Sequence, residues 1–133
     1  MAKMKLTVCG LATAVLLASL VGLSAQQSGF KRTVLQQGDL SAPGREAVMA
    51  VAELQPGGAS GRHTHPGEEV AYVLTGPLTI EFDGKPAKTL RTGEAFLIPA
   101  GTVHNARNMG TGVAKVVATY VVEKGKPVAT PAP

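Results

Sequence analysis

All three histidines of the 133-residue chain lie between residues 57 and 108. His63 and His65 are two residues apart, and Glu69 follows His65 by four residues. Because successive side chains of an extended strand point to opposite faces, these even spacings place the three groups on one face. His104 comes from a later segment, behind a Pro-Ala-Gly turn signal. We therefore predict that three imidazoles and one carboxylate converge on a divalent transition metal ion.

The two halves of this stretch resemble the paired motifs of the cupin superfamily. The first half fits the pattern G-x5-H-x-H-x3-E-x6-G and the second fits G-x5-P-x-G-x2-H-x3-N. The fixed positions are filled by Gly57, His63, His65, Glu69 and Gly76, and then by Gly93, Pro99, Gly101, His104 and Asn108. The resemblance implies a small antiparallel β-barrel, a double-stranded β-helix or jelly roll, with one metal ion inside. It also implies a homodimer formed through edge strands.

The identity of the metal and the reaction stay open at this point. Neutral imidazole and carboxylate suit Fe, Mn, Ni, Co, Cu and Zn alike. Four protein ligands leave one or two coordination positions for a small-molecule ligand or substrate. Small cupins of this pattern are similar to quercetinase-type dioxygenases, and also to isomerases, decarboxylases and lyases. A non-catalytic binding or sensor module and a purely structural metal are the alternatives, because a fold does not determine a reaction.

The chain begins with a short basic segment and an uncharged apolar run, followed by small and polar residues. Residues 1–25 therefore resemble a secretory signal peptide, which predicts a secreted or periplasmic protein. An uncleaved membrane anchor is the alternative, since the run approaches the length needed to span a bilayer. The single cysteine, Cys9, lies in this leader, so the mature domain has no thiol.

The remaining chain divides into three parts. Residues 26–44 form an N-terminal arm with a first short strand, residues 45–123 form the β-barrel domain, and residues 124–133 form a flexible, disordered tail. Within the domain we predict strands at 46–54, 69–75, 78–82, 96–98, 103–108 and 113–122, with a hairpin turn at Asp83-Gly84. Short strands and Gly-rich turns are typical of an all-β sandwich or barrel.

For the other polar residues, the expected direction of the side chain follows from the number of residues that separate it from a predicted ligand on the same strand. Glu68 and Tyr72 are an odd number of residues from Glu69, so they are expected to lie on the opposite face of the strand and to point outward. Asn108 shares the parity of His104, which favours either support of the metal site from behind or capping of a strand end. Tyr120 is expected to face inward, where it is a candidate catalytic proton donor or a core aromatic residue. For Arg62 and Arg107 (both out of parity with neighbouring histidines) a surface role is favoured.

The charge pattern excludes nucleic acid as a partner. The formal net charge is +4, and it falls to about +2 without the leader lysines Lys3 and Lys5. The chain has no basic run with interleaved aromatic residues.

Overall fold

The computed structural model describes residues 29–133, which form ten β-strands and no helix. The long strands follow alternating apolar sequence, as expected when one sheet face is buried. The strands are β1 (Phe30–Asp39), β2 (Arg45–Leu54), β3 (His63–Thr64), β4 (Gly67–Thr75), β5 (Leu78–Phe82), β6 (Lys85–Leu90), β7 (Ala95–Ile98), β8 (His104–Arg107), β9 (Ala114–Glu123) and β10 (Thr130–Pro131).

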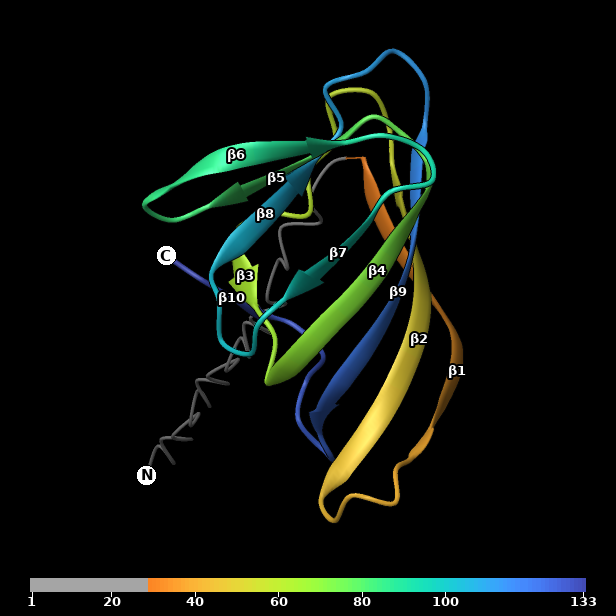
Figure 1. The fold of residues 1–133 in the computed structure, drawn as a ribbon, viewed down its shortest axis with the longest axis vertical. Coiled ribbons are helices and arrows are strands. Elements are labelled where there is room, and N and C mark those ends of the chain that lie inside the picture. Colours follow the sequence, from red (N-terminus) through yellow and green to blue (C-terminus); the bar gives the residue numbers. More distant parts are fainter. Residues whose placement is uncertain (1–28) are drawn as a thin grey trace, which may run out of the picture.

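The strands form two five-stranded antiparallel sheets. The first has the order β1-β2-β9-β4-β7 and contains the longest strands, whereas the second has the order β10-β3-β8-β5-β6 and is built from short ones. Figure 1 shows β2, β9 and β4 running side by side, with β5, β6 and β8 lying across from them. The predicted all-β antiparallel fold is confirmed. Among residues 29–133, no strand pairing joins the two sheets into one hydrogen-bonded barrel.

The core lies between the sheets and is made of small and medium apolar side chains. On β2, β4 and β9 every second residue is buried, in agreement with the predicted alternation. On β7, which was predicted to be a short buried strand, Ile98 is buried but Leu97 is 58% exposed. The buried apolar residues are Val48, Ala50, Ala52, Leu54, Ala71, Val73, Leu78, Ile80, Leu90, Ile98, Ala114, Val116, Ala118, Tyr120 and Val122.

The predicted hairpin at Asp83-Gly84 connects β5 and β6, and Gly84 has the positive φ that such a turn requires. The first strand is longer than expected and reaches Asp39. It is an edge strand that pairs with β2 along its length.

The C-terminal segment differs from the flexible tail that its composition predicted. Thr130 pairs with Thr64 and Pro131 with His63, which makes β10 the edge of the second sheet. Proline is compatible with such an edge because the missing N–H faces away from the ladder. The Ala132 N–H donates to the Arg62 carbonyl at 2.9 Å. A Pro-rich sequence is ordered here by contacts with a distant strand, which composition alone does not reveal.

The predicted signal peptide lies outside the described residues. Within the described part of the chain, no helix has the length and apolarity needed to cross a membrane.

Candidate metal centre

Two short neighbouring strands bring the first and last histidines together. His63 on β3 pairs directly with His104 on β8, and His65 follows β3 by one residue. The ring centres of His63 and His104 are 4.3 Å apart, and one nitrogen from each of the three histidines lies within 4.8 Å of the others. All three side chains are buried. The residues therefore form a cluster that can hold a metal ion.

Each histidine is oriented by a main-chain carbonyl group. The Nδ1 atoms of His63, His65 and His104 lie 2.7, 2.5 and 2.9 Å from the carbonyl oxygens of Gly61, Val128 and Thr102. A carbonyl oxygen only accepts hydrogen bonds, so each Nδ1 must be the protonated donor. This leaves Nε2 as the metal-binding nitrogen, which is the usual result of such an outer hydrogen bond.

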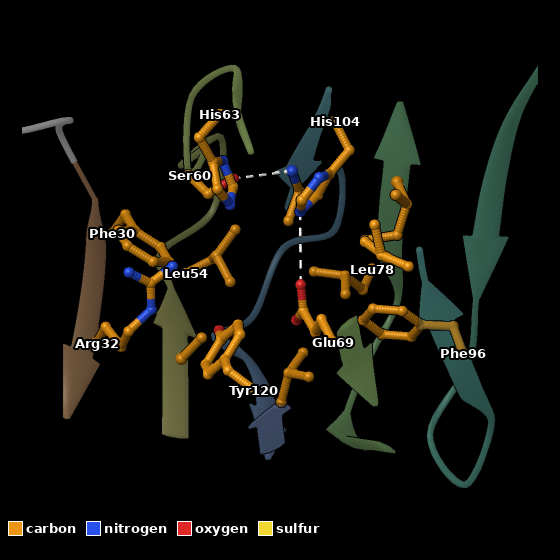
Figure 2. Close-up of a pocket in the computed structure, with 15 residues that line it drawn as sticks. Phe30, Arg32, Leu54, Ser60, His63, Glu69, Leu78, Phe96, His104 and Tyr120 are labelled. Atoms are coloured by element: carbon orange, nitrogen blue, oxygen red, sulfur yellow. Dashed lines mark hydrogen bonds and ion pairs between the residues drawn. The ribbon is translucent and has the colours of Figure 1, made fainter. Parts of the chain in front are cut away.

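Glu69 extends from β4 toward the same cluster. Its Oε2 atom lies 3.0 Å from His65 Nε2 and 3.4 Å from His104 Nε2, and Figure 2 shows the contact with His104. Burial on its own raises the pKa of this carboxyl. Hydrogen bonds and opposite charge from His104 and His65 outweigh burial and lower its pKa to about 2. Glu69 is therefore ionised at neutral pH, and its oxygen lies beside two of the imidazole nitrogens.

The donor set fits a transition metal ion. Burial lowers the pKa of His63 to about 4, so its imidazole is neutral at pH 7, as a ligand must be. His104 Nε2 is buried, and its one polar contact among residues 29–133 is the long 3.4 Å approach to Glu69 Oε2. A buried nitrogen with so weak a contact is costly unless something else binds it. A divalent cation held by the imidazoles and the carboxylate resolves that cost and suits their borderline character.

A pocket opens beside the cluster, between the two sheets. It has about 360 Å³ of empty space, part of which is open to solvent. Its walls are mostly apolar, with Phe30 and Phe96 at the sides, while His63, His104 and Glu69 form part of its lining (Figure 2). A metal in the cluster is therefore adjacent to a largely apolar space that opens to solvent.

Tyr120 lies in the wall of this pocket. It faces inward from β9, as predicted, and is only 2% exposed. Its ring centre is 4.7 Å from that of His65. Burial, together with the Glu69 carboxylate, raises the pKa of Tyr120 to about 12. The phenol is therefore protonated at neutral pH and serves as a hydrogen-bond donor rather than as a base.

Asn108 is away from the metal cluster, and the capping alternative describes it better than support of the metal. Its Nδ2 donates to the carbonyls of Leu54 and Gly112, and its Oδ1 accepts from the Gly110 N–H. Asn108 thus closes the loop between β8 and β9 onto the end of β2. Residue spacing along a strand could not reveal this capping role, because the loop brings three main-chain groups around the Asn108 amide.

The other charged residues follow the predicted directions, but one arginine was overlooked. Glu68 and Tyr72 face outward, and Arg62 and Arg107 form ion pairs with Asp83 and Glu81. Arg32, in contrast, points from β1 into the pocket (Figure 2). Its inward direction follows from its pairing with buried Ala52, which no local sequence signal reveals.

Comparison with known proteins places the chain in a family. The model of the Cupin domain matches residues 50–126, and the chain belongs to this family. Germin-like protein 1-1 from Oryza sativa subsp. japonica is 39% identical over 77 residues, which cover 54% of this chain and 36% of that protein. The chain thus spans about a third of the length of this relative.

Solved structures share the fold. A protein with a double-stranded β-helix domain from Klebsiella pneumoniae is 20% identical and has a TM-score of 0.67. The match covers 80% of this chain and 86% of the Klebsiella chain. An oxalate oxidase in complex with glycolate is 25% identical and has a TM-score of 0.63, covering 81% of this chain and 57% of its own. The expected cupin family is confirmed.

Proposed function

We propose that this cupin is a metal-dependent enzyme that acts on a small organic substrate. The proposal rests on one observation. His63, His104 and Glu69 belong both to the cluster of metal donors and to the lining of the apolar pocket. A structural metal is normally closed off by its ligands, whereas a catalytic one faces a space for substrate.

His63, His65, His104 and Glu69 hold the metal in this proposal. The ion, when bound, supplies Lewis-acid or redox chemistry at a coordination position left open by the protein. The carbonyl groups behind the imidazoles keep the three rings in place. Tyr120 donates a hydrogen bond or a proton from its buried hydroxyl, and the aliphatic walls exclude water from the substrate.

The comparisons support a small organic substrate but do not identify it. The oxalate oxidase with a similar fold holds glycolate, and a polyketide cyclase and a DMSP lyase are among the structures with the same fold. The dioxygenase, isomerase and lyase reactions that the sequence resemblance implies all stay open within the proposal. The metal is one divalent ion per chain, chosen from Fe, Mn, Ni, Co, Cu and Zn.

A non-catalytic binding or sensor module is the second candidate. It is favoured by the few proton-transfer groups in the pocket. Besides the proposed metal ligands, the titratable residues of the lining are Arg32 and Tyr120, and the pKa of Tyr120 is raised to about 12. Such a lining can retain a ligand without converting it.

Metal analysis followed by a turnover screen tests the two candidates. We expect about one transition metal ion per purified chain, and none in the double variant His63→Ala/His104→Ala. The metal-loaded protein is then offered enolic, phenolic and carboxylic compounds, with and without O2. Conversion of one compound that depends on the two histidines supports the enzyme. Tight retention of a compound without conversion supports the binding module, and absence of metal from the wild-type protein contradicts both.

We further propose that the chain is exported with loss of residues 1–25 and forms a homodimer. Support for the dimer comes from apolar side chains exposed on the outer face of the first sheet, among them Val70, Tyr72, Leu74 and Leu97. Neighbouring pairs on adjacent strands, such as Val70 with Leu97, make this surface continuous. Mass spectrometry of the exported protein checks the cleavage. Sedimentation of wild type and Tyr72→Glu checks the dimer, which the charged variant is expected to weaken.

A further inference from the structure

Among the described residues 29–133, Arg32 is the one cation of the pocket lining that is not a candidate metal ligand. It extends from edge strand β1, opposite Ala52 of β2, and its guanidinium lies between two aromatic rings. The Arg32 Cζ atom is 5.3 Å from the ring centre of Phe30 and 5.3 Å from that of Tyr120. Cation–π contacts on both sides hold the partly exposed guanidinium against the pocket (Figure 2).

This guanidinium has no acidic partner. The nine acidic residues of the chain all lie in the described part, between Asp39 and Glu123. None of the ion pairs formed within residues 29–133 includes Arg32. Its Nε atom is buried and lacks a hydrogen-bond partner among the same residues. Arg62 provides the contrast, because it makes a two-pronged pair with Asp83 at the surface.

The Arg32 side chain is partly exposed, but its buried Nε–H group lacks an acceptor among residues 29–133, which is unfavourable beside apolar walls. The charge lies beside an aliphatic wall formed by Leu54, Ile98 and Val116. An apolar residue would pack against this wall equally well, so packing does not explain the arginine. A ligand that brings a negative oxygen to this position removes the cost. The planar fork of arginine matches a carboxylate best, since two parallel N–H groups meet two oxygens.

We infer that Arg32 binds the anionic group of the ligand, and that this ligand is a small carboxylate with an apolar body. The inference rests on the proposed function, because it assigns a substrate class to the same pocket. Tyr120 separates the guanidinium from the histidine cluster, with its ring 5.3 Å from Arg32 Cζ and 4.7 Å from the His65 ring. A small molecule therefore suffices to reach from Arg32 to the metal side of the pocket. Its apolar body contacts the aliphatic walls.

Calorimetric titration of the full chain loaded with zinc tests this assignment. The probes are butyrate and benzoate, their neutral amides butyramide and benzamide, and inorganic phosphate. We expect at least one carboxylate to bind wild type about tenfold more tightly than its amide. Arg32→Gln should weaken carboxylate binding by about 10- to 100-fold, as expected for loss of a charge-assisted hydrogen bond, and leave amide binding unchanged. Arg32→Lys should retain part of the affinity, since it keeps the charge but not the fork.

Lys31→Gln is the matched control. Lys31 is adjacent, carries the same charge and is exposed on the other face of β1. It should bind every probe as wild type does. Zinc affinity should be equal in all variants, which also shows that each is folded. Three results overturn the inference: no carboxylate binds better than its amide, Arg32→Gln binds carboxylates as wild type does, or phosphate binds more tightly than every carboxylate.

These failures are separate from failure of the proposed function. If wild type binds neither zinc nor any of the other candidate metals, the metal proposal is wrong, and the same titration on the metal-free chain still decides whether carboxylate binding depends on Arg32. If zinc binds and the carboxylate preference is independent of Arg32, the substrate class is wrong while the metal proposal stands.

Discussion

The two sheets contribute different parts of the pocket. The first sheet has long strands whose regular alternation gives an apolar inner face, interrupted by Arg32, Glu69 and Tyr120 on three separate strands. The second sheet has short strands, and two of them place His63 and His104 side by side. The first sheet therefore sets the shape of the pocket by packing. The second sets its metal chemistry through strands that end at turns, where main-chain carbonyls orient the rings.

Removing the histidines of the second sheet should have the largest effect. We expect the double variant His63→Ala/His104→Ala to lose metal binding by more than about 100-fold and to lose the thermal stabilisation that metal provides, which is about 2.7 kcal/mol at a hundredfold excess over Kd. Competition with a chromogenic chelator measures the affinity. Glu68→Ala, which removes an exposed carboxylate next to Glu69, should behave as wild type. Equal metal affinity in the double variant would disprove the site.

The regular packing of the first sheet can be broken at Gly67. A Cβ atom at this position would lie 1.8 Å from the Val121 carbonyl oxygen, so β4 and β9 must move apart. We expect Gly67→Ala to lower the free energy of unfolding by about 3 kcal/mol, measured by urea denaturation. Gly38→Ala is the control, because open space surrounds that position and its φ is not positive. Stability close to wild type for Gly67→Ala would show that the β4–β9 register adapts easily.

The edge of the second sheet depends on the C-terminal segment. Ending the chain at Lys126 removes the Val128 carbonyl that accepts from His65 Nδ1. Metal affinity should fall by about 10- to 100-fold, as is typical when the hydrogen bond behind a ligand is lost. Ending the chain at Thr130 keeps that carbonyl and should retain most of the affinity. If both truncations weaken metal binding equally, ordering of β10 matters more than orientation of His65.

Acid should destabilise the metal-free protein through buried ionisable groups of both sheets, His63 on β3 and Glu69 on β4. The pKa of His63 is lowered from 6.5 to about 4, so the unfolded state binds more protons between these values and stability falls as pH falls through this range. Glu69, with a pKa lowered from 4.5 to about 2, adds a loss below pH 4.5. We expect about 2 kcal/mol less stability at pH 4.5 than at pH 7, measured by urea unfolding. His63→Gln should show a flatter pH dependence; an unchanged slope would contradict the assignment.

Sequence reasoning succeeded where a side chain's direction follows from its own strand. Alternation placed Tyr120 inward and Tyr72 outward. His63, His65 and Glu69 converge as predicted, but not on one regular strand, because β3 and β4 belong to different sheets. Sequence reasoning failed where direction depends on a distant partner. Arg32 faces the pocket because β1 pairs with β2 in one register. The Val128 carbonyl reaches His65 across 63 positions of sequence. Neither contact has a local pattern, because each is set by tertiary packing.

The smallest effect is expected at the surface of the second sheet. Arg62 forms two hydrogen bonds with Asp83, at 2.7 and 2.9 Å, and donates from Nε to the Pro133 carbonyl. The side chains of Arg62 and Asp83 are about half exposed, at 49% and 52%, so water and salt screen the pair. Arg62→Gln should lower the free energy of unfolding by less than about 1 kcal/mol, and high salt should reduce the difference.

The metal affinity of Arg62→Gln tests whether the surface arginine holds the C-terminal segment next to His65. An affinity equal to wild type means that β10 pairing and the Val128 contact hold the C-terminal segment without the surface arginine. A loss of metal affinity as large as that of the chain ending at Lys126 would instead mean that Arg62 holds the C-terminal segment against His65. In that case the edge of the second sheet, and not its paired strands, would limit how firmly the metal is held.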